Sequence, residues 1–226
     1  FNKRQKRFNK DPKFEEMYSD AVTEYIDAGY AEKVVEDMEP KDCFYIPHQV
    51  VIKEESSSTK VRLVFDGSAA ENEKKSINNR LEKGPVLQPL LNSILLRFRS
   101  HKIAITSDIR RMYLMIAIAE DDRNKLRFFW QNPETKEIEV YRNCVLPFGL
   151  SCSPFLAVGT VHHHLLKYEA AYPELVNELI AATYIDDMLS GVETEDDAVK
   201  MYEDSTTIMK EASMDLRKWN TNNKRV

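Results

Sequence analysis

The sequence feature that most constrains the fold is a pair of adjacent acids inside an otherwise apolar segment, residues 179–192. In this segment, LIAATYIDDMLSGV, Asp186 and Asp187 have apolar runs on both sides. A charged side chain in a poorly solvated position is costly unless it has a partner, so we interpret the segment as a β-hairpin with the acids at its tip. A divalent cation is a natural partner, because hard oxygen ligands suit Mg²⁺. The alternative is an ordinary turn, where Asp is common without any metal.

A third acid strengthens the metal interpretation. Asp108 lies near the end of a short apolar run, IAITSDI, at residues 103–109. Two-metal phosphoryl transfer requires carboxylates from separate elements that converge on ions roughly 3.5–4 Å apart. An acid at a strand end, beside a hairpin with two more acids, can supply that geometry. The alternative for Asp108 is the cap of a following helix.

The rest of the chain alternates between helical and strand-like patterns. Apolar residues at helical spacing predict helices over residues 13–27, 86–99, 153–168 and 194–212, the last with Thr194 as its cap. Runs of β-branched and aromatic residues predict strands over residues 103–109, 113–120, 125–131 and 138–146. Residues 44–53 and 60–67 are expected to pair as a hairpin. This mixed order of helices and strands predicts an α+β fold.

Composition sets wider limits. The 226 residues suffice for one or two domains, and no apolar run approaches the ~20 residues of a membrane span. The net charge of −5 argues weakly against nucleic-acid binding. A carboxylate site contributes negative charge that bound metal would neutralise, which softens this objection. Three cysteines without a C-x-x-C pair argue against a disulfide framework or a zinc site and favour a reducing compartment.

The N-terminal end indicates a fragment or a processed product, because residue 1 is Phe1 rather than Met. The basic run over residues 1–10 either touches nucleic acid or forms a mobile tail.

Five segments, in order along the chain, resemble the motifs of reverse transcriptases. They are KVRLVFD at 60–66, SDIRRMY at 107–113, LPFGL with the following SP at 146–154, YIDD at 184–187 and LRKWN at 216–220. The strings VRLVFDGSA, YIDDM and LRKWN are most similar to the BEL/Pao class of long-terminal-repeat retrotransposons.

This resemblance implies a polymerase right-hand fold with fingers and palm only. The expected domains are an N-terminal basic tail and helix over 1–43, fingers over 44–102, and a palm over 103–226 that contains some fingers insertion at about 114–150. The palm would be an antiparallel sheet with helices packed on one face. A thumb and a ribonuclease H domain do not fit after Trp219, so we expect this fragment to bind template–primer weakly and extend it poorly.

The implied function is that of an RNA-directed DNA polymerase domain in a retrotransposon polyprotein. It would add dNMP to a primer 3′-hydroxyl by two-metal nucleotidyl transfer, with Mg²⁺ or Mn²⁺ as cofactor. The implied partners are an RNA or DNA template with primer, dNTPs, and the rest of the polyprotein, without a membrane. The implied location is intracellular, in a cytoplasmic particle of the element, with nuclear access of the product. The alternatives are a catalytically silent or domesticated domain that binds nucleic acid or protein, and an RNA-dependent RNA polymerase.

The resemblance assigns roles to the residues around the first acid. Asp108, Asp186 and Asp187 would be the catalytic, metal-binding acids, and Ile109 would offer its backbone to a metal or to the triphosphate. Tyr113 would be the steric gate that crowds a ribose 2′-hydroxyl and favours deoxynucleotides. The alternative for Tyr113 is an ordinary aromatic of the core.

Further residues would contact the nucleotide. Arg62 would hold the triphosphate, because its forked donors match phosphate oxygens. Lys53 would be a second phosphate contact or a solvated side chain at a loop tip. Phe148 and Gly149 would line the pocket near the sugar, although Gly149 could serve only a turn.

Two other groups carry less weight. Lys218 is interpreted as solvated, with a contact to the leaving pyrophosphate as the alternative. The run His162-His163-His164 is expected to lie on a helix surface, because consecutive helix positions point in different directions whereas metal ligands need i, i+4 spacing.

Overall fold

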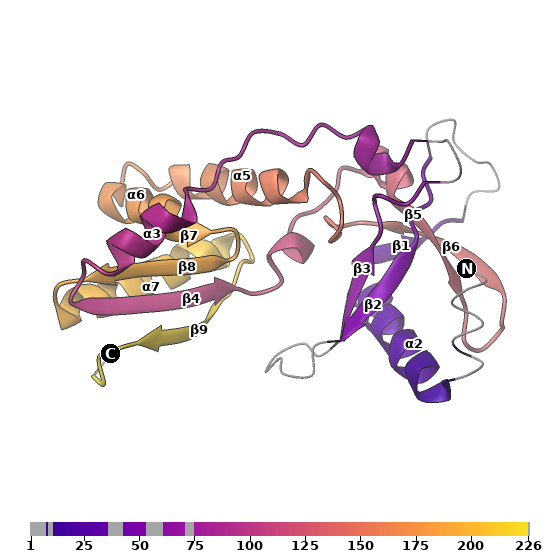
Figure 1. Ribbon diagram of the computed structural model, residues 1–226, viewed down its shortest axis with the longest axis horizontal. Helices are drawn as coiled ribbons and strands as arrows, with labels where there is room; N and C mark the ends of the chain where they lie inside the picture. The colour runs from indigo at the N-terminus through magenta and orange to yellow at the C-terminus, as the bar shows by residue number, and fades with distance from the viewer. Residues whose placement is uncertain (1–7, 9–10, 36–42, 53–60, 71–74, 226) are drawn as a thin grey trace. The chain divides into compact units, whose positions relative to one another are not determined.

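The computed structural model describes residues 8, 11–35, 43–52, 61–70 and 75–225 (Figure 1). The chain forms two compact units. The first unit contains residues 1–83 and 117–153, and the second contains residues 84–116 and 154–226. Each unit is therefore built from two separate stretches of sequence.

The first unit combines one long helix with short strands. Its elements are α2 (Pro12–Asp27), β1 (Ala31–Lys33), β2 (His48–Ile52), β3 (Val61–Phe65), η1 (Ile77–Asn79), α4 (Glu120–Arg123), η3 (Asn124–Leu126), β5 (Arg127–Gln131) and β6 (Ile138–Asn143). The strands form an antiparallel sheet in the order β1-β6-β5 and a separate hairpin of β2 with β3.

Helix α2 begins where the sequence provides a cap. The Asp11 carboxylate accepts a hydrogen bond from the Phe14 amide at 3.1 Å. Pro12 stands at the first helical position and has no backbone N–H that would need a partner. On the buried face of α2, Tyr18 stacks on Trp130 at 5.8 Å between ring centroids and donates to the His48 carbonyl at 2.8 Å. Aromatic packing therefore joins α2 to both groups of strands.

The second unit is built on a four-stranded antiparallel sheet in the order β7-β8-β4-β9. Its elements are α3 (Leu91–Phe98), β4 (Ile103–Ile109), η2 (Met112–Met115), α5 (Ser153–Leu166), α6 (Pro173–Ala182), β7 (Thr183–Tyr184), β8 (Asp187–Val192), α7 (Glu195–Glu211) and β9 (Leu216–Thr221). Helix α7 contacts β4, β8 and β9, while α3 and α6 contact β8. Figure 1 shows β4 between β8 and β9.

Strand β4 alternates between a buried and a partly open face. Ile103, Ile105 and Ile109 are nearly inaccessible, and the intervening Ala104, Thr106 and Asp108 are half-buried. Since successive strand residues point to opposite faces, Asp108 lies on the face opposite the buried isoleucines.

The mixture of helices and antiparallel sheets confirms the predicted α+β class. The helices predicted over 13–27, 153–168 and 194–212 are present, and the Thr194 hydroxyl caps α7 by accepting from the Asp197 amide at 3.2 Å. The strands predicted over 103–109, 125–131 and 138–146 and the hairpin from 44–53 and 60–67 are also present, with shorter ends in most cases. No helix in the described ranges is long and apolar enough to cross a membrane.

The strand predicted over 113–120 is wrong. Residues 112–115 form a 3₁₀ turn, and Ala117 makes only an isolated bridge to Val145. The cause is Arg111, whose φ of 50° turns the chain sharply after β4. A left-handed backbone conformation is uncommon for residues other than glycine, so the sequence does not indicate the turn at Arg111.

Two other predicted elements have different boundaries. The helix predicted over 86–99 begins only at Leu91. Pro89 stands just upstream, and the residue that precedes a proline disfavours helical backbone. The hairpin predicted over 179–192 is shorter, because residues 179–182 end α6. A short apolar run does not distinguish a helix end from a strand. Helix α6 and strands β1 and β9 were not predicted.

Candidate active site

The two adjacent acids lie at a tight turn between β7 and β8. Tyr184 pairs with Asp187, so Ile185 and Asp186 form the turn. Ile185 has a φ of 58°, a conformation that is costly for a β-branched residue. Both acids are exposed. The turn therefore presents two carboxylates to solvent at the cost of local strain.

The third acid lies on the neighbouring strand. Asp108 of β4 is directly opposite Asp187 of β8, and the Ile109 amide donates to the Asp186 carbonyl oxygen at 2.7 Å. Side chains of directly opposed residues share one face, with Cβ atoms roughly 4.5–5.5 Å apart. The backbone thus brings all three predicted acids to one end of the sheet, although Asp108 is distant from the other two in sequence.

Strand β9 supplies two cations to Asp108. Arg217 is the cross-strand partner of Asp108, and its Nε lies 3.3 Å from Oδ1. The Lys218 ammonium donates to Oδ2 at 2.9 Å. The side chain of Asp108 is only 17% exposed, and Oδ1 makes no hydrogen bond of good geometry. Lys218 is exposed, as the interpretation of a solvated residue predicts, and its ammonium group is also paired with Asp108.

The donor set suits a hard divalent cation, because carboxylate oxygens are the ligands that Mg²⁺ and Mn²⁺ prefer. Among the residues that the structure describes, however, no group of three or more His, Cys, Asp and Glu side chains is arranged to hold a metal ion. Both oxygens of Asp108 instead contact cations of β9. The backbone fits a metal site, and the Asp108 side chain would have to exchange partners to complete it.

Tyr113 belongs to the same region of the second unit. It lies in η2, directly after the left-handed Arg111, and is half-buried. Burial raises the pKa of its hydroxyl, and the negative charge of Asp186 raises it further. Tyr113 is therefore close enough to the turn to feel the charge of Asp186, and it is not part of a strand.

The predicted nucleotide contacts lie in the first unit. Arg62 is an exposed residue of β3, opposite Val51. Lys53 lies outside the described residues. Phe148 and Gly149 follow β6, and the Phe148 carbonyl accepts from the Phe65 amide at 3.1 Å. The segment with Phe148 and Gly149 is therefore fixed to the strand that carries Arg62.

Gly149 has a structural reason to be glycine. Its φ is 107°, and a Cβ there would lie 1.7 Å from the Phe65 carbonyl oxygen. Asn78 fixes the same turn: it donates to the Gly149 carbonyl at 3.1 Å and accepts from the Ser151 amide at 2.8 Å. No local pattern selects Asn78, because its two partners are more than 70 positions away in the chain.

The three consecutive histidines of α5 differ in their burial. His163 is exposed as predicted, but His164 is buried and donates from Nε2 to the Ile208 carbonyl at 2.7 Å. His162 is half-buried, and burial lowers its pKa. A surface position is therefore wrong for His164, which ties α5 to α7.

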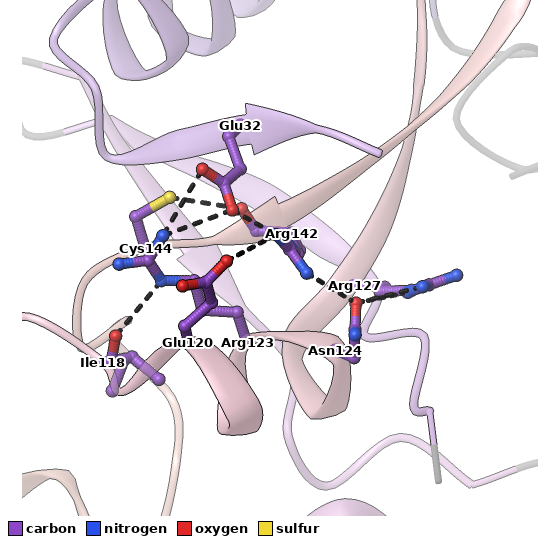
Figure 2. Close-up of polar contacts among 8 residues, drawn as sticks. All are labelled: Glu32, Ile118, Glu120, Arg123, Asn124, Arg127, Arg142 and Cys144. Atoms are coloured by element: carbon purple, nitrogen blue, oxygen red, sulfur yellow. Dashed lines mark hydrogen bonds and ion pairs between the residues drawn. The ribbon is translucent and has the colours of Figure 1, made fainter. Parts of the chain in front are cut away.

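A second polar cluster lies in the first unit (Figure 2). The Glu32 carboxylate of β1 accepts from Arg142 of β6 at 2.6 Å and from Arg123 of α4 at 3.3 Å. Asn124 adds contacts to Arg142 and to the fully buried Arg127, at 3.2 Å and 2.9 Å. These side chains join β1, β6 and the turn before β5, so the cluster has a structural role.

Comparison with protein families gives one match. The model of a family described as reverse transcriptase (RNA-dependent DNA polymerase) matches residues 36–221. The matched range contains Asp108, Asp186, Asp187 and the β9 cations. No curated protein matches the chain by sequence.

Proposed function

Because the chain belongs to the reverse transcriptase family, we propose that it is the RNA-directed DNA polymerase domain of a retrotransposon polyprotein. In the proposed reaction the primer 3′-hydroxyl attacks the α-phosphate of a dNTP, and pyrophosphate leaves. The observation that supports this function best is the cross-strand pairing of Asp108 with Asp187, beside the turn that carries Asp186.

The proposed roles of the acids follow from that pairing. Asp108, Asp186 and Asp187 would hold two Mg²⁺ or Mn²⁺ ions, which when bound activate the attacking hydroxyl and stabilise the leaving group. The Ile109 amide already donates to Asp186. The proposal therefore assigns the Ile109 carbonyl, rather than its amide, to a metal or to the triphosphate.

We also propose roles for the residues that are expected to contact the nucleotide. We assign Tyr113 to the gate against ribonucleotides, Arg62 and Lys53 to the triphosphate, and Phe148 and Gly149 to the pocket near the sugar. In this proposal residues 1–43 form the N-terminal tail and helix, residues 44–102 form the fingers, and residues 103–226 form the palm with some fingers insertion at about 114–150. The forked guanidinium of Arg62 is exposed, as a phosphate ligand requires.

The wider setting is proposed from the sequence motifs. The strings at 61–69, 184–188 and 216–220 support an element of the BEL/Pao class. Its polymerase would act with a thumb and a ribonuclease H domain of the same polyprotein, on a primed RNA or DNA template. We place the reaction in a cytoplasmic particle of the element, with the DNA product reaching the nucleus.

The test is primer extension by the polyprotein that contains this chain, with Mg²⁺, dNTPs and a primed RNA template. Asp186→Asn is expected to reduce extension by at least roughly a thousandfold. The variant loses the carboxylate charge that would hold the catalytic cations. Asp196→Asn is the matched control, since it removes one exposed acid at the start of α7. Equal extension by the wild type and Asp186→Asn would refute the metal role.

One observation favours a different function, a catalytically silent domain that binds nucleic acid or protein. Asp108 is paired with Arg217 and Lys218 instead of contributing to an assembled group of acids. Metal-dependent nucleotide incorporation distinguishes the two functions. A silent domain would bind the primed template and incorporate nothing at any Mg²⁺ or Mn²⁺ concentration.

A further inference from the structure

We propose that Lys218 occupies the metal-binding side of Asp108 in the metal-free protein and must leave when a divalent cation binds. This inference rests on the proposed function, because it concerns the same acids. It adds a residue that sets the metal affinity of the site. Lys218 is a positioning residue here, since it acts through Asp108.

The contact between β9 and Asp108 depends on an irregular backbone. Consecutive residues of a regular strand point to opposite faces, yet Arg217 and Lys218 both contact the same carboxylate. Two distortions allow this. The pairing of β4 with β9 shifts register between Thr106 and Asp108, and Lys218 has a φ of 54°. Such irregularities commonly redirect a side chain, and here they aim a second cation at Asp108.

The two cations use both oxygens of Asp108. Arg217 lies at Oδ1 and Lys218 at Oδ2, 3.3 Å and 2.9 Å away. A metal ion on Asp108 would need at least one of these oxygens. It would also lie a few ångströms from an ammonium group of the same charge sign, which is unfavourable. Metal binding at Asp108 therefore competes with the Lys218 contact.

Lys218 is the cation that can leave. Its side chain is 45% exposed on a flexible stem, whereas that of Arg217 is 30% exposed and its Nε is buried. The two contacts are thermodynamically linked. The factor by which the Lys218–Asp108 contact is favoured is therefore also the factor by which it weakens metal binding. Removing the ammonium group should tighten binding by about 1.4- to fivefold, the range for a partly exposed ion pair.

The experiment measures binding of Mn²⁺ to residues 1–226 from the electron paramagnetic resonance signal of the free ion. Lys218→Met keeps the length of the stem and removes the charge. Lys200→Met, at an exposed position of α7, makes the same change in net charge and is the matched control. Lys218→Arg keeps a cation and should keep wild-type affinity. Lys218→Gln is the second neutral variant, and circular dichroism confirms that each variant is folded.

The expected result is tighter Mn²⁺ binding by Lys218→Met and Lys218→Gln than by the wild type and Lys200→Met. Asp186→Asn in the Lys218→Met background should abolish the gain. Unchanged or weaker binding by both neutral variants would overturn the inference. If wild-type binding is lost in Asp186→Asn but unaffected by Lys218→Met, only the inference fails. If no variant binds Mn²⁺ through Asp186, the inference and the proposed metal role both fail.

Discussion

Asp108 and Asp187 occupy directly opposed positions on the antiparallel strands β4 and β8. Like charges at opposed positions of a sheet destabilise the fold, by up to about 1 kcal/mol. Arg217 and Lys218 offset part of this repulsion at Asp108, while Asp187 is exposed to solvent. The opposed pair of acids is therefore unfavourable for the stability of the metal-free protein.

Replacing Asp187 by Asn should stabilise the metal-free protein and remove its activity. We expect the free energy of unfolding to rise by about 0.5 kcal/mol, because the cross-strand repulsion is lost. Urea denaturation of residues 1–226 in the presence of a chelator measures the change. Asp196→Asn, away from any opposed acid on β4, should not produce the gain. A less stable Asp187→Asn protein would show that Asp187 has a structural role.

Gly149→Ala should destabilise the first unit strongly. The added Cβ would meet the Phe65 carbonyl oxygen at 1.7 Å, and the φ of 107° is unfavourable for alanine. We expect a loss of about 3 kcal/mol or more in the free energy of unfolding. Gly29→Ala separates the two causes, because Gly29 has a φ of 73° and no atom within 4 Å of the added Cβ. The free energy of unfolding of Gly29→Ala should fall by only about 1 kcal/mol. Equal losses in the two variants would contradict the proposed clash at Gly149.

The stability contributed by Glu32 should depend on pH. Burial raises the pKa of Glu32, but hydrogen bonds and charge from Arg142 and Arg123 outweigh it, so the pKa lies below the ordinary value of 4.5. A carboxyl group with a lowered pKa in the folded state stabilises above its unfolded pKa and loses that contribution as pH falls through the folded value. The contribution is therefore complete at neutral pH and declines below about pH 4.5.

The measurement compares urea midpoints of the wild type and Glu32→Gln at about pH 7 and about pH 3.5. Glu32→Gln should be less stable than the wild type at the higher pH, and the difference should shrink at the lower pH. Glu134→Gln, at an exposed turn between β5 and β6, is the control. A difference that stays constant with pH would mean that the ionised form of Glu32 has no special stabilisation.

Local sequence signals predicted the elements that depend on near neighbours. Thr194 and the apolar spacing after it predicted α7, and apolar residues at helical spacing predicted α2. These features act within a few residues, through capping and through one buried helix face. The acids at 108, 186 and 187 were also recognisable as candidate site residues. A charged side chain within an apolar run is unusual in any part of a chain.

The sequence did not predict features that depend on backbone irregularity or distant pairing. The left-handed Arg111 moved Tyr113 from a strand into a 3₁₀ turn, and the irregular backbone at Lys218 put that residue on Asp108. Asn78 and Gly149 are 71 positions apart. No local pattern encodes such contacts, because they depend on how strands pair across the whole unit.

Tyr113 provides the sharpest test of nucleotide choice. Its ring lies just after β4, and its raised pKa reports burial and the charge of Asp186. If the ring crowds a ribose 2′-hydroxyl, Tyr113→Ala should raise ribonucleotide incorporation relative to deoxynucleotide incorporation by roughly tenfold or more. Tyr113→Phe keeps the ring and should keep the discrimination. The ratio of kcat/KM for a ribonucleotide and its deoxynucleotide, measured with the polyprotein that contains this chain, decides the matter. Relaxed discrimination in Tyr113→Phe as well would assign the effect to the hydroxyl group instead of the ring.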